Sequence, residues 1–270
     1  MPVPGVTHAG AEGPAPLALV TGGHRRLGAR ITAALAKAGY RIAIHGSHDA
    51  EPDSKLAEVL AASGQDWHGF VADFADPANA AHLMAQVIAH FSTPPDLLVN
   101  SASLFGQDRL DDVEADDLAR HFAVNASAPA LLTKAFAAAH SGEAGTTRDR
   151  AIINILDQRL EHPHVDQLAY TLSKFALAGL TQASARTLAP HIRVNAVAPG
   201  LTLVTPDYAD GQAERLAGLM PLARLPLPEE VAEAVLYLAR ARATTGQVIH
   251  VDGGAHMIAY ERDFMSMSRE

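Results

Sequence analysis

The sequence predicts an α/β fold, a three-layer αβα sandwich in which helices cover both faces of a seven-stranded parallel sheet. Short apolar runs of strand length alternate along the chain with longer segments whose apolar residues recur at helical spacing. Strands of a parallel sheet are buried on both faces, so they are expected to be continuously apolar, as these runs are. The 270 residues show no internal repeat and no shift of composition that would separate two domains.

The apolar runs place the strands, and the segments between them place the helices. The first run stops at a glycine turn, after which a helical pattern continues to Gly39. Asp76-Pro77 predicts the start of a later helix, since Asp can cap a helix and Pro tolerates its first position. Strands are expected at 16–20, 41–45, 69–72, 96–100, 151–156, 193–197 and 247–251. Further helices are expected at 53–63, 115–139 and 166–189.

The two ends of the chain and one internal segment lack this pattern. Residues 1–16 are rich in Pro, Gly and Ala without an apolar block, which predicts a flexible tail and no signal peptide. Residues 139–150 carry Gly, Thr and charge and are expected to form a loop. We therefore expect one domain over 17–254. A C-terminal tail over 255–270 would follow it, either packed on a neighbouring subunit or frayed.

The composition disfavours several classes of function. Cysteine is absent, and the 14 His show no spacing typical of a zinc site, so no metal is expected. No apolar run reaches the roughly 20 residues of a membrane helix. The net charge of -9 disfavours nucleic acid and anionic membranes as partners. We expect a soluble, cytoplasmic protein whose partner is a small molecule.

A glycine-rich turn between the first strand and the first helix is a candidate phosphate site. It reads Thr21-Gly-Gly-His-Arg-Arg-Leu-Gly28. In this position backbone N–H groups and the helix dipole favour a bound pyrophosphate. A plain strand-to-helix turn also favours glycine, so the turn needs support from other residues.

The end of the second strand indicates which dinucleotide binds. An enzyme that prefers NAD usually places an acid there to accept the ribose 2′-hydroxyl. This chain has His45-Gly-Ser47-His48 instead, and Asp49 comes late for that role. The two histidines and Ser47, with the fixed charge of Arg25, could hold a 2′-phosphate. The sequence therefore favours NADPH. The alternative is that Arg25 is a solvated helix-start residue and that the histidines lie in a surface loop.

Tyr170 and Lys174 are the candidate catalytic pair. They are four residues apart in a segment of helical pattern and therefore share one helical face. A lysine ammonium beside a phenol favours the phenolate, so Lys174 is expected to lower the pKa of Tyr170 toward working pH. Tyr170 would then be a usable acid. The alternative is an amphipathic helix with an incidental Tyr and Lys.

Ordered motifs along the chain resemble the short-chain dehydrogenase/reductase family. They run from about Leu17 to Gly254 and comprise Thr21-Gly22 with Gly28, Asn100-Ser-Ala102, Asn125, Tyr170 with Lys174, Arg193-Val-Asn195, Pro199-Gly200 and Asp252-Gly-Gly254. The resemblance implies a Rossmann-type fold, a nicotinamide cofactor and hydride transfer to a carbonyl or imine carbon. It also implies a substrate lid at about residues 201–222 and a homotetramer.

The resemblance also implies roles for single residues. Tyr170 would donate a proton, and Lys174 would bind the nicotinamide ribose and tune Tyr170. Asn125 would hold a water of the proton relay, and Asn100 would stabilise the central strands beside the cofactor. The implied cofactor contacts are Gly22, Arg25, Arg26, Leu27, Gly28, His45, Ser47, Asp73, Phe74, Asn100, Ser101, Ala102, Ser103, Tyr170, Lys174, Pro199, Gly200 and Thr202.

Two departures from the commonest family pattern narrow the class. Arg26 stands where the phosphate turn usually has its middle glycine, and Asp157 stands where the catalytic serine is usual, thirteen residues before Tyr170. With Asn100-Ser-Ala-Ser-Leu-Phe105, they resemble pteridine reductases and bacterial dihydropterin reductases. That resemblance implies that Arg26 faces substrate and cofactor phosphates and that Phe105 stacks on the pterin ring. The implied substrate site is Arg26, Ser103, Phe105, Asp157 and Tyr170.

The chemistry of a carboxylate at position 157 agrees with such a substrate. An ionised carboxylate would repel the negative charge that develops on a ketone oxygen. A reduced pterin nitrogen instead needs a proton, which a carboxylic acid beside a phenol can relay. We therefore expect an NADPH-dependent reductase that takes a dihydropterin to the tetrahydro level.

Other interpretations stay open at this point. The chain could be an NADPH-dependent reductase of another carbonyl or imine, or a nucleotide-binding regulatory protein without turnover. Asp157 could be a solvent-facing loop residue, and Phe105 a core or lid aromatic.

Overall fold

In the computed structural model, which describes residues 14–141, 149–205 and 208–268, seven parallel strands form one sheet in the order β3-β2-β1-β4-β5-β6-β7. They are β1 (Leu17–Thr21), β2 (Arg41–Gly46), β3 (Trp67–Val71), β4 (Leu97–Asn100), β5 (Ala151–Ile155), β6 (Arg193–Pro199) and β7 (Val248–Val251). Each expected strand is confirmed. Most of the expected N-terminal tail and of the loop at 139–150 lies outside the described residues.

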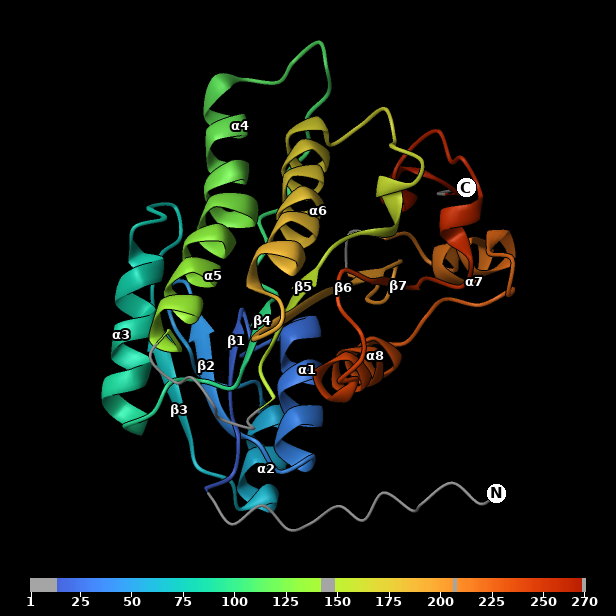
Figure 1. Cartoon of the computed structure of the whole chain (residues 1–270). Helices are drawn as coiled ribbons and strands as arrows, with labels where there is room; N and C mark the ends of the chain where they lie inside the picture. The colour runs from blue at the N-terminus through green and yellow to red at the C-terminus, as the bar shows by residue number, and fades with distance from the viewer. Residues whose placement is uncertain (1–13, 142–148, 206–207, 269–270) are drawn as a thin grey trace, which may run out of the picture.

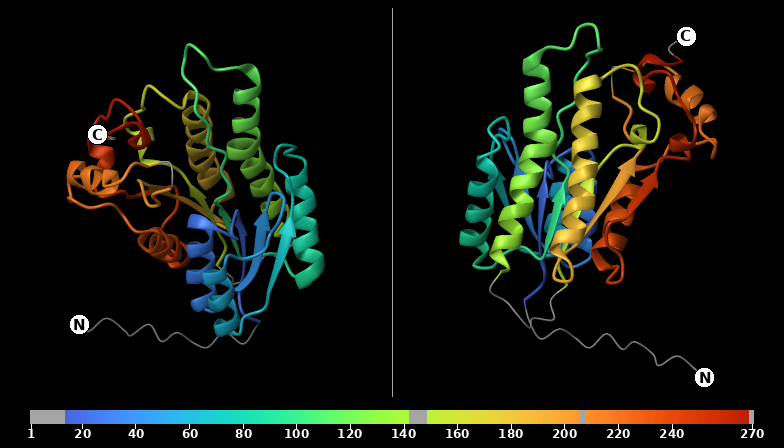
Figure 2. Two further views of the ribbon diagram at one scale, coloured as in Figure 1. Left: turned by 180° about the vertical axis from the view of Figure 1, so that it is seen from behind. Right: turned by 45° about the horizontal axis from the view of Figure 1, so that its top comes forward.

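Helices cover both faces of the sheet (Figure 1). One face carries α1 (Arg26–Lys37), α2 (Ser54–Ser63) and α8 (Pro228–Arg240). The other carries α3 (Asn79–Phe91), α5 (Ala128–Ala139) and α6 (Leu168–Leu188). Figure 2 shows the same layers from behind and from above. Among the described residues, no helix is long and apolar enough to cross a membrane.

The first strand shows why its sequence is continuously apolar. All of its residues are buried. Successive side chains of a strand point to opposite faces of the sheet. Ala18 and Val20 therefore pack with α1 and α8, whereas Leu17 and Leu19 pack with α3 and α5.

The position of β1 in the sheet determines where a ligand can bind. β1 pairs with β2 on one side and with β4 on the other, so the order of the strands reverses at this point. In sheets of this type the carboxyl ends of the strands leave a crevice at such a reversal. The loops that follow β1 and β4 therefore flank the expected site.

Two helices differ from the expectation. The helix expected from Asp76-Pro77 begins at Asn79, because the Asp76 carboxylate accepts the N–H of Ala78 in a turn that precedes the helix (3.0 Å). The segment expected as one helix over 115–139 comprises α4 (Ala115–Phe122), a π-helical stretch Ala123–Ser127 and α5. π-helical stretches inside helices are frequent at functional sites. This one carries Asn125.

The expected lid region contains the short helix α7 (Gln212–Leu219). The C-terminal segment folds back onto it in Figure 1. Gln212 Nε2 donates hydrogen bonds to the main-chain oxygens of Phe264 and Met267. The alternative of a frayed C-terminal tail is therefore wrong for residues 255–268, which pack on their own chain.

Candidate active site

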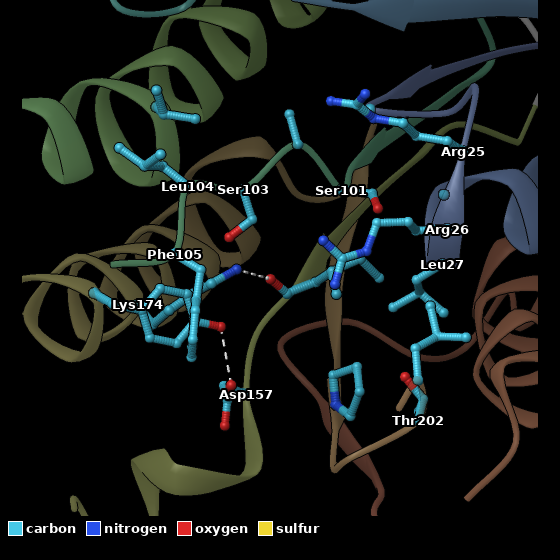
Figure 3. Close-up of a pocket in the computed structure, with 18 of the residues that line it drawn as sticks. Arg25, Arg26, Leu27, Ser101, Ser103, Leu104, Phe105, Asp157, Lys174 and Thr202 are labelled. Atoms are coloured by element: carbon cyan, nitrogen blue, oxygen red, sulfur yellow. Dashed lines mark hydrogen bonds between the residues drawn. The ribbon is translucent and has the colours of Figure 1, made fainter. Parts of the chain in front are cut away.

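A cleft of about 1040 Å³ lies where the loops after β1 and β4 meet the ends of β5 and β6 (Figure 3). The start of α6 and the C-terminal segment also line it. The cleft brings together most of the expected site residues. They are Gly22, Arg25, Arg26, Leu27, Gly28, His45, Ser47, Asp73, Phe74, Ser101, Ala102, Ser103, Phe105, Asp157, Tyr170, Lys174, Pro199, Gly200 and Thr202.

The turn after β1 keeps its shape through close backbone contacts. Gly22 has a φ of +63°, and a Cβ there would lie 3.0 Å from the Cα of Ala102. A Cβ on Gly28 would lie 2.0 Å from the carbonyl oxygen of Gly22. In the described part of the chain, no side chain caps the first turn of α1. Its N–H groups and the helix dipole can therefore receive an anion from the cleft.

Arg26 adopts the left-handed backbone conformation, with a φ of +55°. This conformation costs a residue other than glycine roughly 1–2 kcal/mol, which explains why glycine is common in this position of such turns. Figure 3 shows the Arg26 side chain pointing toward the middle of the cleft. Backbone strain that is kept at a pocket indicates a function for the side chain.

Asp157 and Lys174 lie close together inside the cleft (Figure 3), and Tyr170 lines the cleft with them. The Tyr170 hydroxyl donates a hydrogen bond to Asp157 Oδ2 at 2.9 Å. Lys174 Nζ donates to the main-chain oxygen of Ile155 at 2.8 Å. Tyr170 and Lys174 are both buried near the start of α6, and Asp157 follows β5. The prediction that Tyr170 and Lys174 share one helical face is confirmed.

The electrostatics of Tyr170 differ from the expectation. Burial, and then the negative charge of Asp157, raise the pKa of Tyr170 well above its ordinary value. Burial also lowers the pKa of Lys174 to about 8. The expected lowering of the Tyr170 pKa by Lys174 is wrong here, because the ammonium bonds to Ile155 and lies 5.5 Å from the centroid of the phenol ring. Tyr170 therefore keeps its proton at neutral pH and can act as a donor.

Phe105 forms a wall of the cleft beside Tyr170. The two ring centroids are 4.8 Å apart and the rings meet edge to face. The Phe105 side chain is 43% exposed, so its ring is accessible to a ligand and is not buried in the core. The alternative of a core aromatic is therefore wrong. A planar apolar group could pack against this ring.

Asn125 does not line the cleft. Its Oδ1 accepts the N–H of Leu104 at 2.8 Å, while its Nδ2 donates to the Leu104 carbonyl and to Ser173 Oγ, both at 2.9 Å. The side chain thus ties the segment that carries Ser103 and Phe105 to α6. Both amide protons of Asn125 bond within the protein, and its expected role of holding a water stays a prediction.

Asn100 also lies beneath the cleft rather than in its wall. Its Nδ2 donates to Asn154 Oδ1 at 2.8 Å, and Asn154 Nδ2 donates to Thr181 Oγ1 at 2.8 Å. The chain of bonds joins β4, β5 and α6. These bonds agree with the expected role of Asn100 in holding the central strands together. The expected contact of Asn100 with a cofactor stays a prediction.

His45 is buried at the end of β2 and differs from the expected phosphate ligand. Its Nδ1 accepts the N–H of Gly22, and its Nε2 bonds to the carbonyl of Ala72. Burial lowers the pKa of His45 to about 4, so the ring is neutral at physiological pH. His45 therefore supports the turn and stacks on Phe74, with centroids 4.2 Å apart, but offers no charge to a 2′-phosphate.

The other residues expected to hold a 2′-phosphate lie nearer the surface than His45. His48 Nδ1 bonds to Ser47 Oγ at 2.9 Å. Asp73 Oδ1 accepts the N–H of Ala75, which fixes the loop after β3. Arg25 lies on the rim and is exposed. Arg25 and Ser47 thus stay candidates for a 2′-phosphate.

Among the residues that line the cleft and were not expected from the sequence are His24, Arg159 and Asp263. His24 lies inside the glycine turn, and its buried ring nitrogens have no hydrogen-bond partner among the described residues. Arg159 follows Asp157 by two residues, a closeness that could have drawn attention to it. The position of Asp263, far along the chain, left no local signal. The described residues contain no group of three or more His, Cys, Asp or Glu that could hold a metal ion.

Comparison with known proteins gives relatives over most of the chain. A family model described as enoyl-(acyl carrier protein) reductase matches residues 23–256. Pteridine reductase 1 of Leishmania tarentolae is 33% identical over 278 residues, which cover 89% of this chain and 96% of that protein. The 3-oxoacyl acyl-carrier-protein reductase FabG of Staphylococcus aureus is 32% identical over 254 residues, which cover 89% of this chain and 98% of that protein.

A solved structure is similar over the same extent. The FolM alternative dihydrofolate reductase 1 from Brucella canis, complexed with NADP, has a TM-score of 0.80 and 36% sequence identity. The similarity covers 90% of this chain and 95% of that chain.

Proposed function

The chain belongs to the short-chain dehydrogenase/reductase family, and we propose that it reduces a dihydropterin to the tetrahydro level with NADPH. One observation carries the proposal: Tyr170 donates its hydroxyl hydrogen bond to the carboxylate of Asp157, where the commonest members of the family have a serine. The similarity to a pteridine reductase and to an alternative dihydrofolate reductase supports it.

The cleft fits NADPH at several points. The uncapped start of α1 can receive the pyrophosphate. Arg25 and Ser47 can receive the 2′-phosphate. The ring of His24 also lines the cleft; among the described residues it makes no hydrogen bond, and its Nε2 lies 3.7 Å from Asp49 Oδ1. Lys174 uses one ammonium proton on Ile155 and has others for ribose hydroxyls. When bound there, NADPH supplies the hydride for the reduction.

The reduction of a carbon–nitrogen double bond needs a hydride at carbon and a proton at nitrogen. Tyr170 holds the proton, because its raised pKa keeps the phenol intact at neutral pH. A phenolate beside an ionised Asp157 would place two negative charges together, which is unfavourable in a buried site. After the transfer, Asp157 can take up a proton from water in the open cleft and pass it to Tyr170, which restores the phenol. Phe105 and Arg26 would bind the planar, polar pterin ring from either side of Tyr170 and Asp157.

The pKa of Lys174 gives a first test of cofactor binding. We expect the dissociation constant of NADPH to rise roughly tenfold as the pH passes from below to above 8, because Lys174 loses its proton with a pKa of about 8. Calorimetric titration on both sides of this pH measures the change. Lys174→Met should bind weakly without this pH dependence, whereas Lys134→Met, at an exposed position on α5, should behave like the wild type. A pH-independent wild type would contradict the assignment.

The strained backbone of Arg26 gives a second test. Arg26→Gly is expected to raise the free energy of unfolding by about 0.5–1 kcal/mol, since glycine adopts a positive φ without the steric cost. The same change removes a cation from the cleft and should weaken NADPH binding about tenfold. Urea unfolding and calorimetry measure the two effects. Arg26→Lys keeps both the backbone strain and the positive charge, so its free energy of unfolding should match that of the wild type. If Arg26→Gly is instead less stable than the wild type, the Arg26 side chain itself stabilises the turn.

Transfer of deuterium tests the proposed reaction directly. With NADPH deuterated at C4 of the nicotinamide and dihydrobiopterin as substrate, we expect one deuterium in the tetrahydropterin product by mass spectrometry. Cofactor oxidation without deuterium in the product would contradict hydride transfer to the pterin. The similarity to FabG makes a ketone the second substrate to test.

We also propose that the protein is a cytoplasmic homotetramer. Phe122 on α4 and Leu172 and Phe175 on α6 are exposed apolar side chains. Exposed apolar side chains favour association between copies. NADPH and a chain without cysteine both suit a reducing compartment. Light scattering coupled to size exclusion measures the assembly, and a monomer at working concentration would contradict it.

A further inference from the structure

We infer that Asp263, carried by the C-terminal segment, is a positioning residue for the proton donor and acts on Asp157 and Tyr170 through Arg159. The inference rests on the proposed reduction with Tyr170 as donor. It assigns a function in the active site to a segment that follows the last strand of the sheet.

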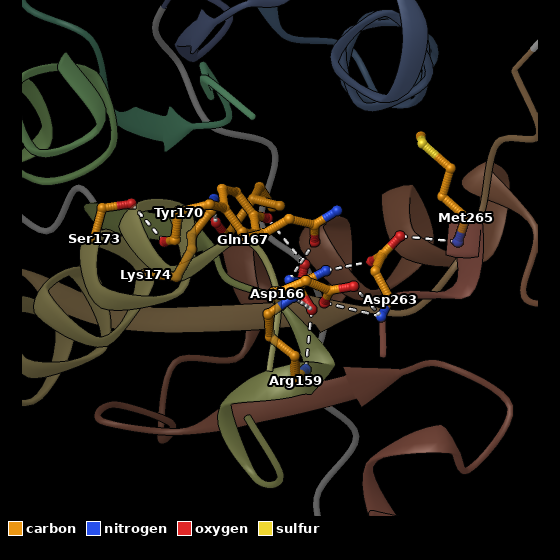
Figure 4. Close-up of polar contacts among 10 residues, drawn as sticks. Arg159, Asp166, Gln167, Tyr170, Ser173, Lys174, Asp263 and Met265 are labelled. Carbon is orange, nitrogen blue, oxygen red and sulfur yellow. Dashed lines mark hydrogen bonds and ion pairs between the residues drawn. The ribbon is translucent and has the colours of Figure 1, made fainter. Parts of the chain in front are cut away.

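The guanidinium of Arg159 links Asp157 to Asp263 of the C-terminal segment. Figure 4 shows Arg159 between Tyr170 and Asp263. Arg159 is 2% exposed, and its Nε lies 3.4 Å from Asp157 Oδ1. Its Nη2 lies 2.5 Å from Asp263 Oδ2, and its Nη1 donates to Gln167 Oε1 at 2.5 Å. The guanidinium carbon also lies 5.0 Å from the centroid of the Tyr170 ring. The buried guanidinium of Arg159 is therefore shared between the carboxylate of Asp157 and the carboxylate of Asp263.

The geometry of the shared cation keeps Asp157 available to Tyr170. Asp263 makes the shorter ion pair with Arg159, so the guanidinium is not drawn wholly onto Asp157. Asp157 Oδ1 accepts the main-chain N–H of Arg159 at 2.9 Å, and Oδ2 accepts the Tyr170 hydroxyl at 2.9 Å. Loss of Asp263 would free the guanidinium to compete for the carboxylate that Tyr170 uses.

Asp263 is itself held in place. Its main-chain N–H donates to both carboxylate oxygens of Asp166, at 3.0 and 3.1 Å. Its Oδ1 accepts the N–H of Met265 at 2.9 Å. The side chain is buried, unlike the neighbouring Glu261, which is exposed. These contacts fix the Asp263 carboxylate against Arg159, as a positioning role requires.

The charges around Tyr170 come from several elements. Asp157 follows β5, Lys174 lies on α6, and Asp263 comes from the C-terminal segment. The carboxylates of Asp157 and Asp263 raise the pKa of Tyr170, whereas Arg159 lowers it. Removal of Asp263 and removal of Arg159 should therefore move the titration of the donor in opposite directions.

Two more titratable groups face this network, and they determine which pH range is informative. His164 lies close to Arg159 and to the carboxylates, and burial lowers its pKa. Asp166 holds the main chain of Asp263. His164, whose pKa is lowered, stays neutral at alkaline pH. Lys174 loses its proton near pH 8, so NADPH is kept saturating at each pH and only shifts of the limb above pH 8 report the proton donor.

The test is the pH profile of kcat for the full chain and its variants. In Asp263→Asn the alkaline limb of the profile should move to lower pH by at least about 0.5 unit, because the donor loses its proton more easily. In Arg159→Gln the alkaline limb should move to higher pH. The factor by which kcat falls should be larger than the factor by which KM rises. Glu261→Gln removes the same charge from an exposed position of the segment and should leave the profile unchanged. If the alkaline limbs of all variants coincide with that of the wild type, the inference is overturned.

Conservative variants separate positioning from folding. Asp263→Glu keeps the charge, so its alkaline limb should stay near that of the wild type although kcat falls. Thermal unfolding and NADPH binding report whether each variant is folded. If Asp263→Asn does not fold, Arg159→Lys carries the test: it keeps one cation but cannot bridge both carboxylates. We expect Arg159→Lys to lose about tenfold in kcat, and an unchanged kcat would overturn the inference.

The proposed function and this inference fail separately. A wild type that does not turn over dihydropterin contradicts the proposed substrate. The profiles are then measured with the ketone that the wild type reduces, since Tyr170 is the donor in either case. Opposite shifts in Asp263→Asn and Arg159→Gln would still support the inference.

Discussion

Tyr170→Phe is expected to lower kcat for dihydropterin reduction by about 10³-fold, within the range that a general acid contributes. The change removes the hydroxyl that bonds to Asp157 but keeps the ring that packs against Phe105. NADPH should therefore bind with little change. Steady-state NADPH oxidation and calorimetry on the same preparation measure the two effects.

A matched tyrosine serves as the control. Tyr237 lies on α8 and is 59% exposed, so Tyr237→Phe should retain full turnover. Turnover in Tyr170→Phe within about tenfold of the wild type would exclude Tyr170 as the main proton donor. A parallel loss of NADPH binding would show instead that the hydroxyl holds the cofactor.

Asp157→Asn is expected to lower dihydropterin turnover by about 10²-fold while the affinity for NADPH stays the same. Asparagine keeps the size of the side chain but cannot return a proton to Tyr170. Arg159 keeps Asp263 and Gln167 as partners in this variant, so the fold should be retained. Thermal unfolding checks this. Unchanged pterin turnover would remove the carboxylate from the mechanism.

Asp157→Ser makes the comparison sharper, because it restores the residue that is usual in the family. A neutral hydroxyl can donate a hydrogen bond to a developing alkoxide, which an ionised carboxylate would repel. We therefore expect ketone reduction to rise and pterin reduction to fall in this variant. If both substrates change in parallel, Asp157 does not discriminate between them.

The fold could be predicted because the physical signals are local and repeated. The central strands β1, β4 and β5 are buried, largely apolar runs, and the glycine turn after β1 stands between a strand and a helix. Tyr170 and Lys174 share a face because helical geometry alone requires it. Nothing in their spacing, however, showed that burial and Asp157 would raise the pKa of Tyr170.

Residues whose roles depend on tertiary contacts were less predictable. His45 looked like a phosphate ligand from its place after a strand, but its ring nitrogens are used on Gly22 and Ala72. Asn125 was selected for a water-holding role, yet a π-helical stretch turns its side chain onto Leu104 and Ser173. Such outcomes depend on partners that are far apart in the sequence.

The C-terminal segment is the clearest case of a long-range effect. Its composition is compatible with a frayed end, and a single sequence does not reveal that Asp263 meets Arg159 across 104 positions. The packing of the segment against α7 and its hydrogen bonds to Asp166 bring the two side chains together. The cleft is therefore partly built by residues of the C-terminal segment, Asp263, Phe264 and Met265, which local sequence patterns leave outside the domain.

The most direct measurement is the rate of NADPH oxidation by the purified wild-type protein, followed at the cofactor's absorbance band. Dihydrobiopterin and dihydromonapterin are compared with a panel of simple ketones and quinones under the same conditions. Fast turnover with the pterins and none with the carbonyls is the expected result. Turnover confined to the carbonyls would contradict a dihydropterin substrate, while leaving the fold and the position of Tyr170 as they are.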